Sequence, residues 1–310
     1  MKAKTKSTLH SLQTECRQKP CRMWRRRCTT MSTVLLLLAF AATCLAQDSD
    51  PVAAKFQQRI KSPVRAWFQP PYIDTKPDLY PNMTMVTSLT DPALAERLTH
   101  RGVTALRWCY GPNSPWSEGK ASYYAQQAAP FVQEGEFRFA GVGIDEWDTG
   151  SVHYPKEKDL AAAGFRTARH QWPDSIMIAY VTMPDETFIE LIKDHTLDLA
   201  IIEGYSFIPD VGGLTMDGIC QRCDVMKMAG LLDRTIVCLG FVSAAPDKQG
   251  RCMTIENLEQ QMREIKMRYP EMPGIALYGF KDENPETLKL IRQADALAAE
   301  LYPTFTNRDR

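Results

Sequence analysis

The strongest constraint on the fold of this chain is a regular alternation between short apolar runs and longer amphipathic segments, which continues from residue 83 to residue 301. Runs of small and β-branched apolar residues are typical of parallel strands that are buried on both faces. The segments between them repeat apolar residues at helical spacing. We therefore predict strands at residues 83–89, 104–110, 139–146, 175–182, 199–205, 235–241 and 274–280.

The amphipathic segments predict helices at residues 93–100, 122–133, 158–170, 186–194, 216–232, 255–269 and 285–301. Thr254 and Asn284 are suited to N-caps. Repeated strand–helix alternation implies parallel strands joined by right-handed crossovers. A further strand at 64–69 would close the sheet, so we predict an α/β fold, a single-domain (β/α)8 TIM barrel, over residues 47–310. A doubly wound open sheet is the alternative, but the Gly-rich phosphate turn usual in that fold does not follow the first strand here.

The N-terminal segment has the pattern of a signal peptide. An apolar stretch at residues 33–42 follows three consecutive arginines at 25–27, and Cys44-Leu45-Ala46 supplies the small residues that signal peptidase reads. The stretch is too short for a stable membrane helix. We predict a signal peptide at residues 1–46, with Met23 as an alternative start. The protein is then secreted or periplasmic, without stable membrane insertion after cleavage.

Removal of this segment makes the chain acidic. Residues 1–46 hold nine of the 37 Lys and Arg residues but one of the 37 Asp and Glu residues, so residues 47–310 carry 28 against 36, a net charge of −8. Nucleic-acid binding requires a basic surface, so we predict no nucleic-acid partner. The spacing of cysteine and histidine predicts no metal site, and no motif predicts a cofactor. Pairing stays open among Cys109, Cys220, Cys223, Cys238 and Cys252.

Most of the predicted strands end in aromatic residues. Aromatic faces stack on the apolar faces of sugar rings, and the carboxyl ends of barrel strands are where α/β barrels keep their active sites. A sealing role in the barrel is the alternative for each residue alone. Together they predict a carbohydrate site that contains Trp67, Arg107, Trp108, Tyr110, Trp147, Tyr180, Tyr205, Phe241 and Tyr278.

Three carboxylates at strand ends are the candidate catalytic residues: Asp145, Glu146 and Glu203. Because side chains alternate along a strand, we expect Glu146 to share a face with Val142 and Ile144, and Asp145 to point to the other face unless the backbone kinks. Glu146 and Glu203 would then both point into the barrel opening, on strands whose backbones lie about 10 Å apart. This separation is compatible with retaining and inverting hydrolysis. A salt bridge between Glu203 and Arg107 is the structural alternative.

The chain resembles the large superfamily of (β/α)8 glycoside hydrolases. The segment Gly143-Ile144-Asp145-Glu146-Trp147 is similar to the Asp-Glu pair of the β-N-acetylhexosaminidases. The resemblance implies that Glu146 protonates the leaving oxygen, that Asp145 orients the acetamido group of the substrate and that Tyr205 is a stabiliser. The His-x-Gly-Gly pattern that precedes the pair in that family is missing here, so no single family is assigned.

These observations predict a secreted glycosidase that cleaves an oligo- or polysaccharide by carboxylate acid/base catalysis, with Glu203 as nucleophile or base. The main alternative is a secreted carbohydrate-binding barrel without catalysis. A lyase or esterase on the same scaffold is a third hypothesis, although a Gly-x-Ser-x-Gly elbow is absent.

Overall fold

The computed structural model describes residues 59–60, 63–112, 119–131, 137–145, 147–148, 154–205, 214–245, 252–279, 282 and 284–304, except for the side chains of 154–156 and 241. The predicted signal peptide and Glu146 lie outside the described residues. Residues Asp50–Arg310 belong to one compact unit.

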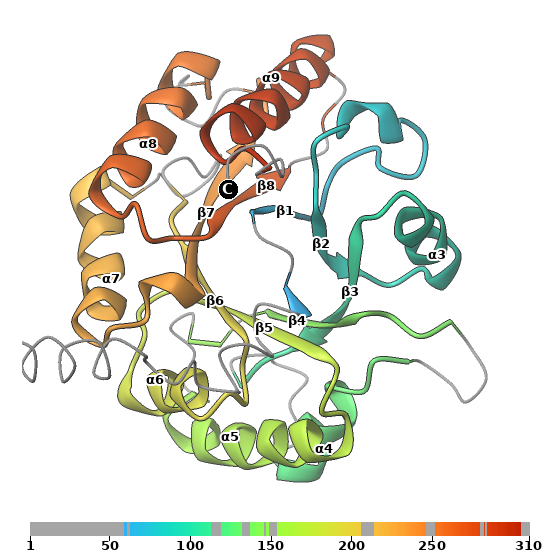
Figure 1. Cartoon of the computed structure of the whole chain (residues 1–310), viewed down its shortest axis with the longest axis vertical. Coiled ribbons are helices and arrows are strands. Elements are labelled where there is room, and N and C mark those ends of the chain that lie inside the picture. Colours follow the sequence, from blue (N-terminus) through green and yellow to red (C-terminus); the bar gives the residue numbers. More distant parts are fainter. Residues whose placement is uncertain are drawn as a thin grey trace, which may run out of the picture. The chain divides into compact units, whose positions relative to one another are not determined.

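Eight parallel strands close into a barrel in chain order, and helices surround them (Figure 1). The first and last strands pair from Val64↔Gly274 to Phe68↔Tyr278, which completes the ring. The predicted fold is therefore confirmed, including the closing strand at the N-terminal end. The strands are β1 (Val64–Phe68), β2 (Met85–Leu89), β3 (Thr104–Tyr110), β4 (Gly141–Asp145), β5 (Ile176–Val181), β6 (Leu199–Glu203), β7 (Thr235–Val242) and β8 (Gly274–Gly279).

Each predicted helix is present, with differences at some ends. Helix α4 (Ala121–Gln127) stops six residues before the predicted end, two residues ahead of the Ala129-Pro130 bond, because a residue before proline disfavours helical geometry. Helix α7 (Met216–Met228) stops before Gly230, whose φ of +72° belongs to a left-handed turn. The helices are α3 (Pro92–His100), α4 (Ala121–Gln127), α5 (Tyr154–Gln171), α6 (Glu186–Lys193), α7 (Met216–Met228), α8 (Ile255–Arg268) and α9 (Pro285–Leu301), with 3-10 helices η1 (Pro77–Leu79) and η2 (Leu232–Arg234).

The predicted caps explain where two helices begin. The Thr254 side chain accepts a hydrogen bond from the backbone N–H of Asn257, and Asn284 accepts one from Glu286. Each satisfies a helix N–H that has no partner inside its own helix. Both N-cap predictions are confirmed.

The strands separate two apolar layers. The smaller layer fills the barrel with residues such as Ala66, Phe68, Ile178 and Ile201. The larger layer lies between strands and helices, because it combines the alternate strand residues with helix residues. Val142 and Ile144 belong to this larger, outer layer. We expected the strand face that carries Val142 and Ile144 to point into the barrel, and this expectation was wrong.

Gly143 lies on the inner face of β4. A Cβ atom built on it would lie 2.0 Å from the carbonyl oxygen of Thr87 on β2, which is not a neighbour of β4 in the ring. The contact therefore crosses the barrel interior. Asp145, two residues further along β4, shares this inner face.

We expect Gly143→Ala to lower the free energy of unfolding by about 3 kcal/mol or more, because the added methyl group forces a backbone shift. Gly218→Ala is the matched control: it places a methyl group at ordinary contact distance, 3.6 Å from Leu214, on a helix. That substitution should leave stability unchanged or raise it by up to about 1 kcal/mol. Urea unfolding measures both, and equal stability of the two variants would contradict the packing described.

The five cysteines predicted to remain after cleavage are all free, and Cys109, Cys220, Cys223 and Cys238 are buried. The described helices include none with the length and hydropathy needed to cross a membrane.

Candidate active site

The candidate active site is the mouth of the barrel, the end at which all eight strands finish. Every second residue of each strand points into the barrel. Near the start of the strands these residues fill the barrel, and at the carboxyl ends they line the mouth. Six of the predicted site residues come together here: Trp108, Tyr110, Asp145, Tyr180, Glu203 and Tyr278, with Tyr205 directly after β6.

Glu203 is a buried carboxylate whose pKa is strongly raised by its surroundings. Its exposed fraction is 7%. Burial, together with the negative charges of Asp145 and Asp148, raises the pKa of Glu203 to about 8, although a hydrogen bond from Thr182 and the cation of Arg222 oppose the shift. The hydroxyl of Thr182 donates to Oε2 at 3.3 Å. Glu203 therefore holds a proton at neutral pH, as a general acid must.

Asp148 holds the segment after β4 against the end of β5. Its two carboxylate oxygens accept hydrogen bonds from the backbone N–H groups of Thr182 and Met183, at 2.5 and 2.6 Å. Burial raises the pKa of Asp148, while these two N–H groups and Arg222 favour its charged form. Asp148 was not among the predicted site residues, because a lone acid in a loop does not reveal which strand it contacts.

Arg222 brings a positive charge to the site from the middle of α7. Its Nη1 donates to the backbone carbonyl of Glu203 at 2.5 Å, and its charge acts on the carboxylates of Glu203 and Asp148. The sequence places Arg222 between two cysteines on a helix. That context carries no signal of a site, because the contact depends on how α7 packs against β6.

Aromatic rings form the wall and floor of the mouth. The rings of Phe68 and Tyr180 lie 4.7 Å apart, those of Phe68 and Tyr278 lie 4.8 Å apart, and those of Tyr205 and Tyr278 lie 5.6 Å apart. Tyr180 is fully buried below them and shares a 2.5 Å hydrogen bond with the hydroxyl of Thr87. The Tyr278 hydroxyl donates to Gln69 Oε1 at 3.0 Å.

A second aromatic pair lies on β3. The rings of Trp108 and Tyr110 are 5.0 Å apart. The buried indole Nε1 of Trp108 has no hydrogen-bond partner among the described residues. A buried N–H that lacks a partner is costly, so this donor is suited to a ligand oxygen in the mouth.

Trp67 and Trp147 do not face the mouth. Both side chains are buried in the outer layer, where Trp67 packs edge-on against Tyr80 and Trp147 against Phe188. The prediction that these two tryptophans contact a sugar does not agree with their position. Aromatic identity at a strand end did not reveal which face of the sheet the ring would take.

Arg107 also points outward. Its guanidinium donates to the backbone carbonyls of Ala129, at 2.9 Å, and Gln127, at the C-terminal end of α4. These carbonyls lack helical partners, and a cation complements the negative end of the helix dipole. Arg107 is therefore neither a substrate contact nor the ion-pair partner of Glu203. The side chain of Phe241 and all of Glu146 lie outside the described residues.

Among the described residues, no group of three or more His, Cys, Asp or Glu side chains is arranged to hold a metal ion. The chemistry that the described mouth offers is that of carboxylates, phenols and one indole N–H.

Comparison with known proteins shows what the architecture is similar to. No family model matches the chain, and no curated protein matches it in sequence. An endo-β-N-acetylglucosaminidase from Cordyceps militaris superposes with a TM-score of 0.56 at 12% identity, over 79% of this chain and 94% of the other. At this identity the likeness shows a shared fold, the (β/α)8 barrel.

Two further solved structures share this fold. A fungal endo-β-N-acetylglucosaminidase of glycosyl hydrolase family 18 has a TM-score of 0.50 at 10% identity, over 76% of this chain and 98% of the other. A xylanase and α-amylase inhibitor protein has a TM-score of 0.51 at 12% identity, over 77% of this chain and all of the other. The barrel therefore occurs in enzymes and in a protein described as an inhibitor.

Proposed function

We propose that this protein is a secreted glycoside hydrolase that acts on an oligo- or polysaccharide at the mouth of the barrel. The observation that carries the proposal is the pair Asp145 and Glu203 on the inner face, with the pKa of Glu203 raised to about 8. Two carboxylates in different environments are what glycosidic bond cleavage requires, one to donate a proton and one to act as a base or nucleophile.

In this proposal Glu203 donates its proton to the oxygen of the scissile glycosidic bond as that bond breaks. The negative charge of Asp145, which helps to keep Glu203 protonated, stabilises the positive charge that develops at the anomeric carbon. Depending on its distance from that carbon, Asp145 attacks directly or activates a water molecule. This assignment differs from the one predicted from the sequence, in which Glu146 is the acid, Asp145 orients the acetamido group and Glu203 is the nucleophile or base.

The walls of the mouth supply binding for a sugar. The rings of Tyr205, Tyr278 and Tyr110 offer faces for stacking, and the indole N–H of Trp108 offers a donor to a hydroxyl or acetamido oxygen. The structural likeness to endo-β-N-acetylglucosaminidases supports oligosaccharides that contain N-acetylglucosamine as the first substrates to test.

The experiment is hydrolysis of a panel of aryl glycosides and polysaccharides by the purified chain. We expect turnover of at least one sugar, and a loss of about 10²-fold or more in kcat/KM for Asp145→Asn. Glu146→Gln, measured in parallel, decides whether Glu146 also takes part. Glu190→Gln on α6, an exposed acid paired with Lys193, is the control and should match the wild type. If Asp145→Asn also matches the wild type on an active substrate, the site assignment fails.

A carbohydrate-binding barrel without catalysis is the second candidate, and the likeness to the inhibitor protein favours it. It predicts binding of a sugar with no product from any substrate of the panel, and affinity that Asp145→Asn leaves nearly unchanged.

A further inference from the structure

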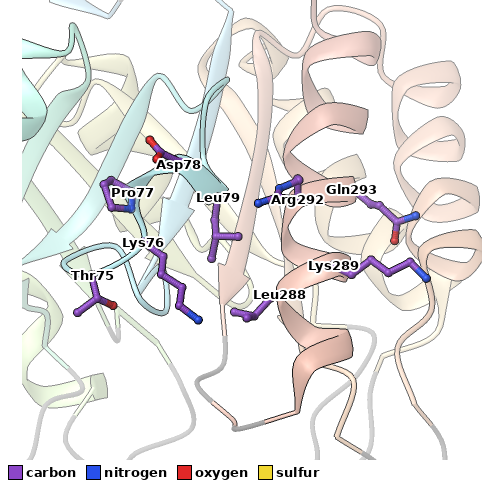
Figure 2. Close-up of a pocket in the computed structure, with 9 residues that line it drawn as sticks. All are labelled: Thr75, Lys76, Pro77, Asp78, Leu79, Leu288, Lys289, Arg292 and Gln293. Carbon is purple, nitrogen blue, oxygen red and sulfur yellow. The ribbon is translucent and has the colours of Figure 1, made fainter.

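A hollow on the side of the barrel lies outside the site described above. It is bounded by η1 with the residues before it and by the first turns of α9 (Figure 2), and its volume is about 580 Å³. We call it the η1–α9 groove. Its lining consists of Thr75, Lys76, Pro77, Asp78, Leu79, Leu288, Lys289, Arg292 and Gln293.

The groove exists because one helix of the ring is replaced by a shorter element. Between β1 and β2 the described chain forms only the three-residue η1, where a (β/α)8 barrel usually carries a full helix. Leu79 is buried at the base, and Leu288 is half-buried beside it. The side chains further from the core remain open to solvent.

Positive charge predominates in the groove. Figure 2 shows Arg292 extending from α9 toward Leu79, and Lys76 extending into the gap from the opposite wall. Lys289 points away from Lys76 and Leu79 in this view, and its Nζ lies 3.5 Å from Oε2 of Glu286. Asp78 is the one acid in the lining, against three cations. This excess contrasts with the net charge of −8 calculated for residues 47–310.

Lys76 and Arg292, the two cations that extend into the groove, have few neutralising contacts. Lys76 Nζ lies 5.3 Å from the centre of the Tyr72 ring, a weak contact at an exposed site. In the described part of the chain, Arg292 makes no hydrogen bond or ion pair. A guanidinium and an ammonium on the two walls of one hollow are suited to acidic groups, because both present N–H donors and positive charge.

The groove begins beside the mouth. Its η1 wall begins nine residues after the carboxyl end of β1, and α9 begins six residues after the end of β8, the neighbour of β1 in the ring. The hydrogen bond from Tyr278 to Gln69 joins the same two strand ends. A glycan that leaves the mouth between β1 and β8 would therefore pass over the entrance of the groove.

We propose that the η1–α9 groove binds an anionic group, a carboxylate or a sulfate ester, on a sugar unit of an acidic polysaccharide. The inference rests on the proposed glycosidase function and narrows its substrates to acidic glycans. Lys76 and Arg292 hold the oxyanion by charge-assisted hydrogen bonds, while Leu79 and Leu288 contact the apolar face of the ring.

The test is direct binding, measured by calorimetry on the full chain at low ionic strength. The probes are a hyaluronan oligosaccharide, which carries carboxylates alone, chondroitin sulfate, which also carries sulfates, and neutral chitohexaose. We expect the double variant Lys76→Gln, Arg292→Gln to bind an acidic probe about tenfold or more weakly, with chitohexaose binding unchanged. Loss with both acidic probes indicates carboxylate recognition, and loss with chondroitin sulfate alone indicates sulfate recognition.

Lys193→Gln is the control, an exposed cation on α6 that is not part of the groove lining. The proposal is overturned if the wild type binds neither acidic probe, or if the double variant binds both as tightly as Lys193→Gln does. Binding requires no turnover, so the two proposals can fail separately. If the wild type hydrolyses no substrate but the double variant still binds acidic glycans more weakly, the glycosidase proposal is refuted and the groove proposal stands.

Discussion

Glu203→Gln is expected to lower kcat/KM by about 10³-fold or more on a substrate with a poor leaving group. Glutamine keeps the shape and the hydrogen bond from Thr182 but has no acidic proton to give the glycosidic oxygen. An activated aryl glycoside should recover much of the lost rate, because its leaving group needs little protonation. Rates on the two substrate types distinguish proton donation from loss of binding.

The pH profile of the wild type provides the second measurement on this residue. A general acid acts only while it is protonated, so kcat/KM should fall as pH rises through about 8, the pKa to which burial raises Glu203. If activity is unchanged between pH 7 and pH 9, Glu203 is not the donor. If the remaining kcat/KM of Glu203→Gln also falls as pH rises through about 8, the conclusion is the same.

Glu203→Gln should raise the stability of the fold, although it lowers activity. Because the folded protein binds the Glu203 proton more tightly than the unfolded chain, this group lowers the free energy of unfolding as pH rises from about 4.5 to about 8. At pH 7 the penalty is about 3 kcal/mol, from about 1.4 kcal/mol per pKa unit. Glu203→Gln should remove the penalty and raise Tm at pH 8. Lower stability at pH 8 would mean that the carboxylate supports the fold.

Asp198→Ala is expected to lower the free energy of unfolding by about 3–5 kcal/mol, because it removes the carboxylate that pairs with the largely buried cations of Arg59 and Arg169. The Asp198 side chain is 1% exposed. Its Oδ2 accepts hydrogen bonds from Arg169 on α5, at 2.7 Å, and from the backbone N–H of Met177 on β5, at 2.8 Å. Its Oδ1 lies 2.7 Å from Nη2 of Arg59, in the segment that precedes β1.

This cluster therefore ties the chain before β1 to the strands on the other side of the barrel. A loss of this size corresponds to a decrease in Tm of about 10 °C for a domain of about 250 residues. Asp194→Ala is the control, because the Asp194–Arg166 pair has the same 2.7 Å separation at the exposed surface. Such pairs contribute at most about 1 kcal/mol. Equal Tm values for the two variants would show that burial of the cluster contributes nothing.

Strand β4 shows most clearly how much of the structure the sequence predicts. The apolar run before Asp145 identified a buried strand and placed that carboxylate at its carboxyl end, and both features are present. A strand that is apolar on both faces does not alternate, however, so its residues do not show which face points inward. The register of β4 between β3 and β5 decides this, and it directs Asp145 inward and Val142 outward.

Strand ends with similar composition show the same limit. Trp108 and Trp147 both follow apolar runs, yet one lies in the mouth and the other in the outer layer. Arg107 and Glu203 are both charges in apolar strands, and only Glu203 points inward. The face that a side chain takes depends on its register within the closed ring.

The sequence by itself determined the barrel, because each strand and helix carries its own local signal in the spacing of apolar residues and in its caps. The tertiary structure alone decided which charges meet. Arg222 on α7 reaches Glu203 on β6, and Asp148 reaches Thr182 at the end of β5, through packing that no local pattern records. The pKa of Glu203 follows from that packing, because burial and neighbouring charge are properties of the assembled barrel.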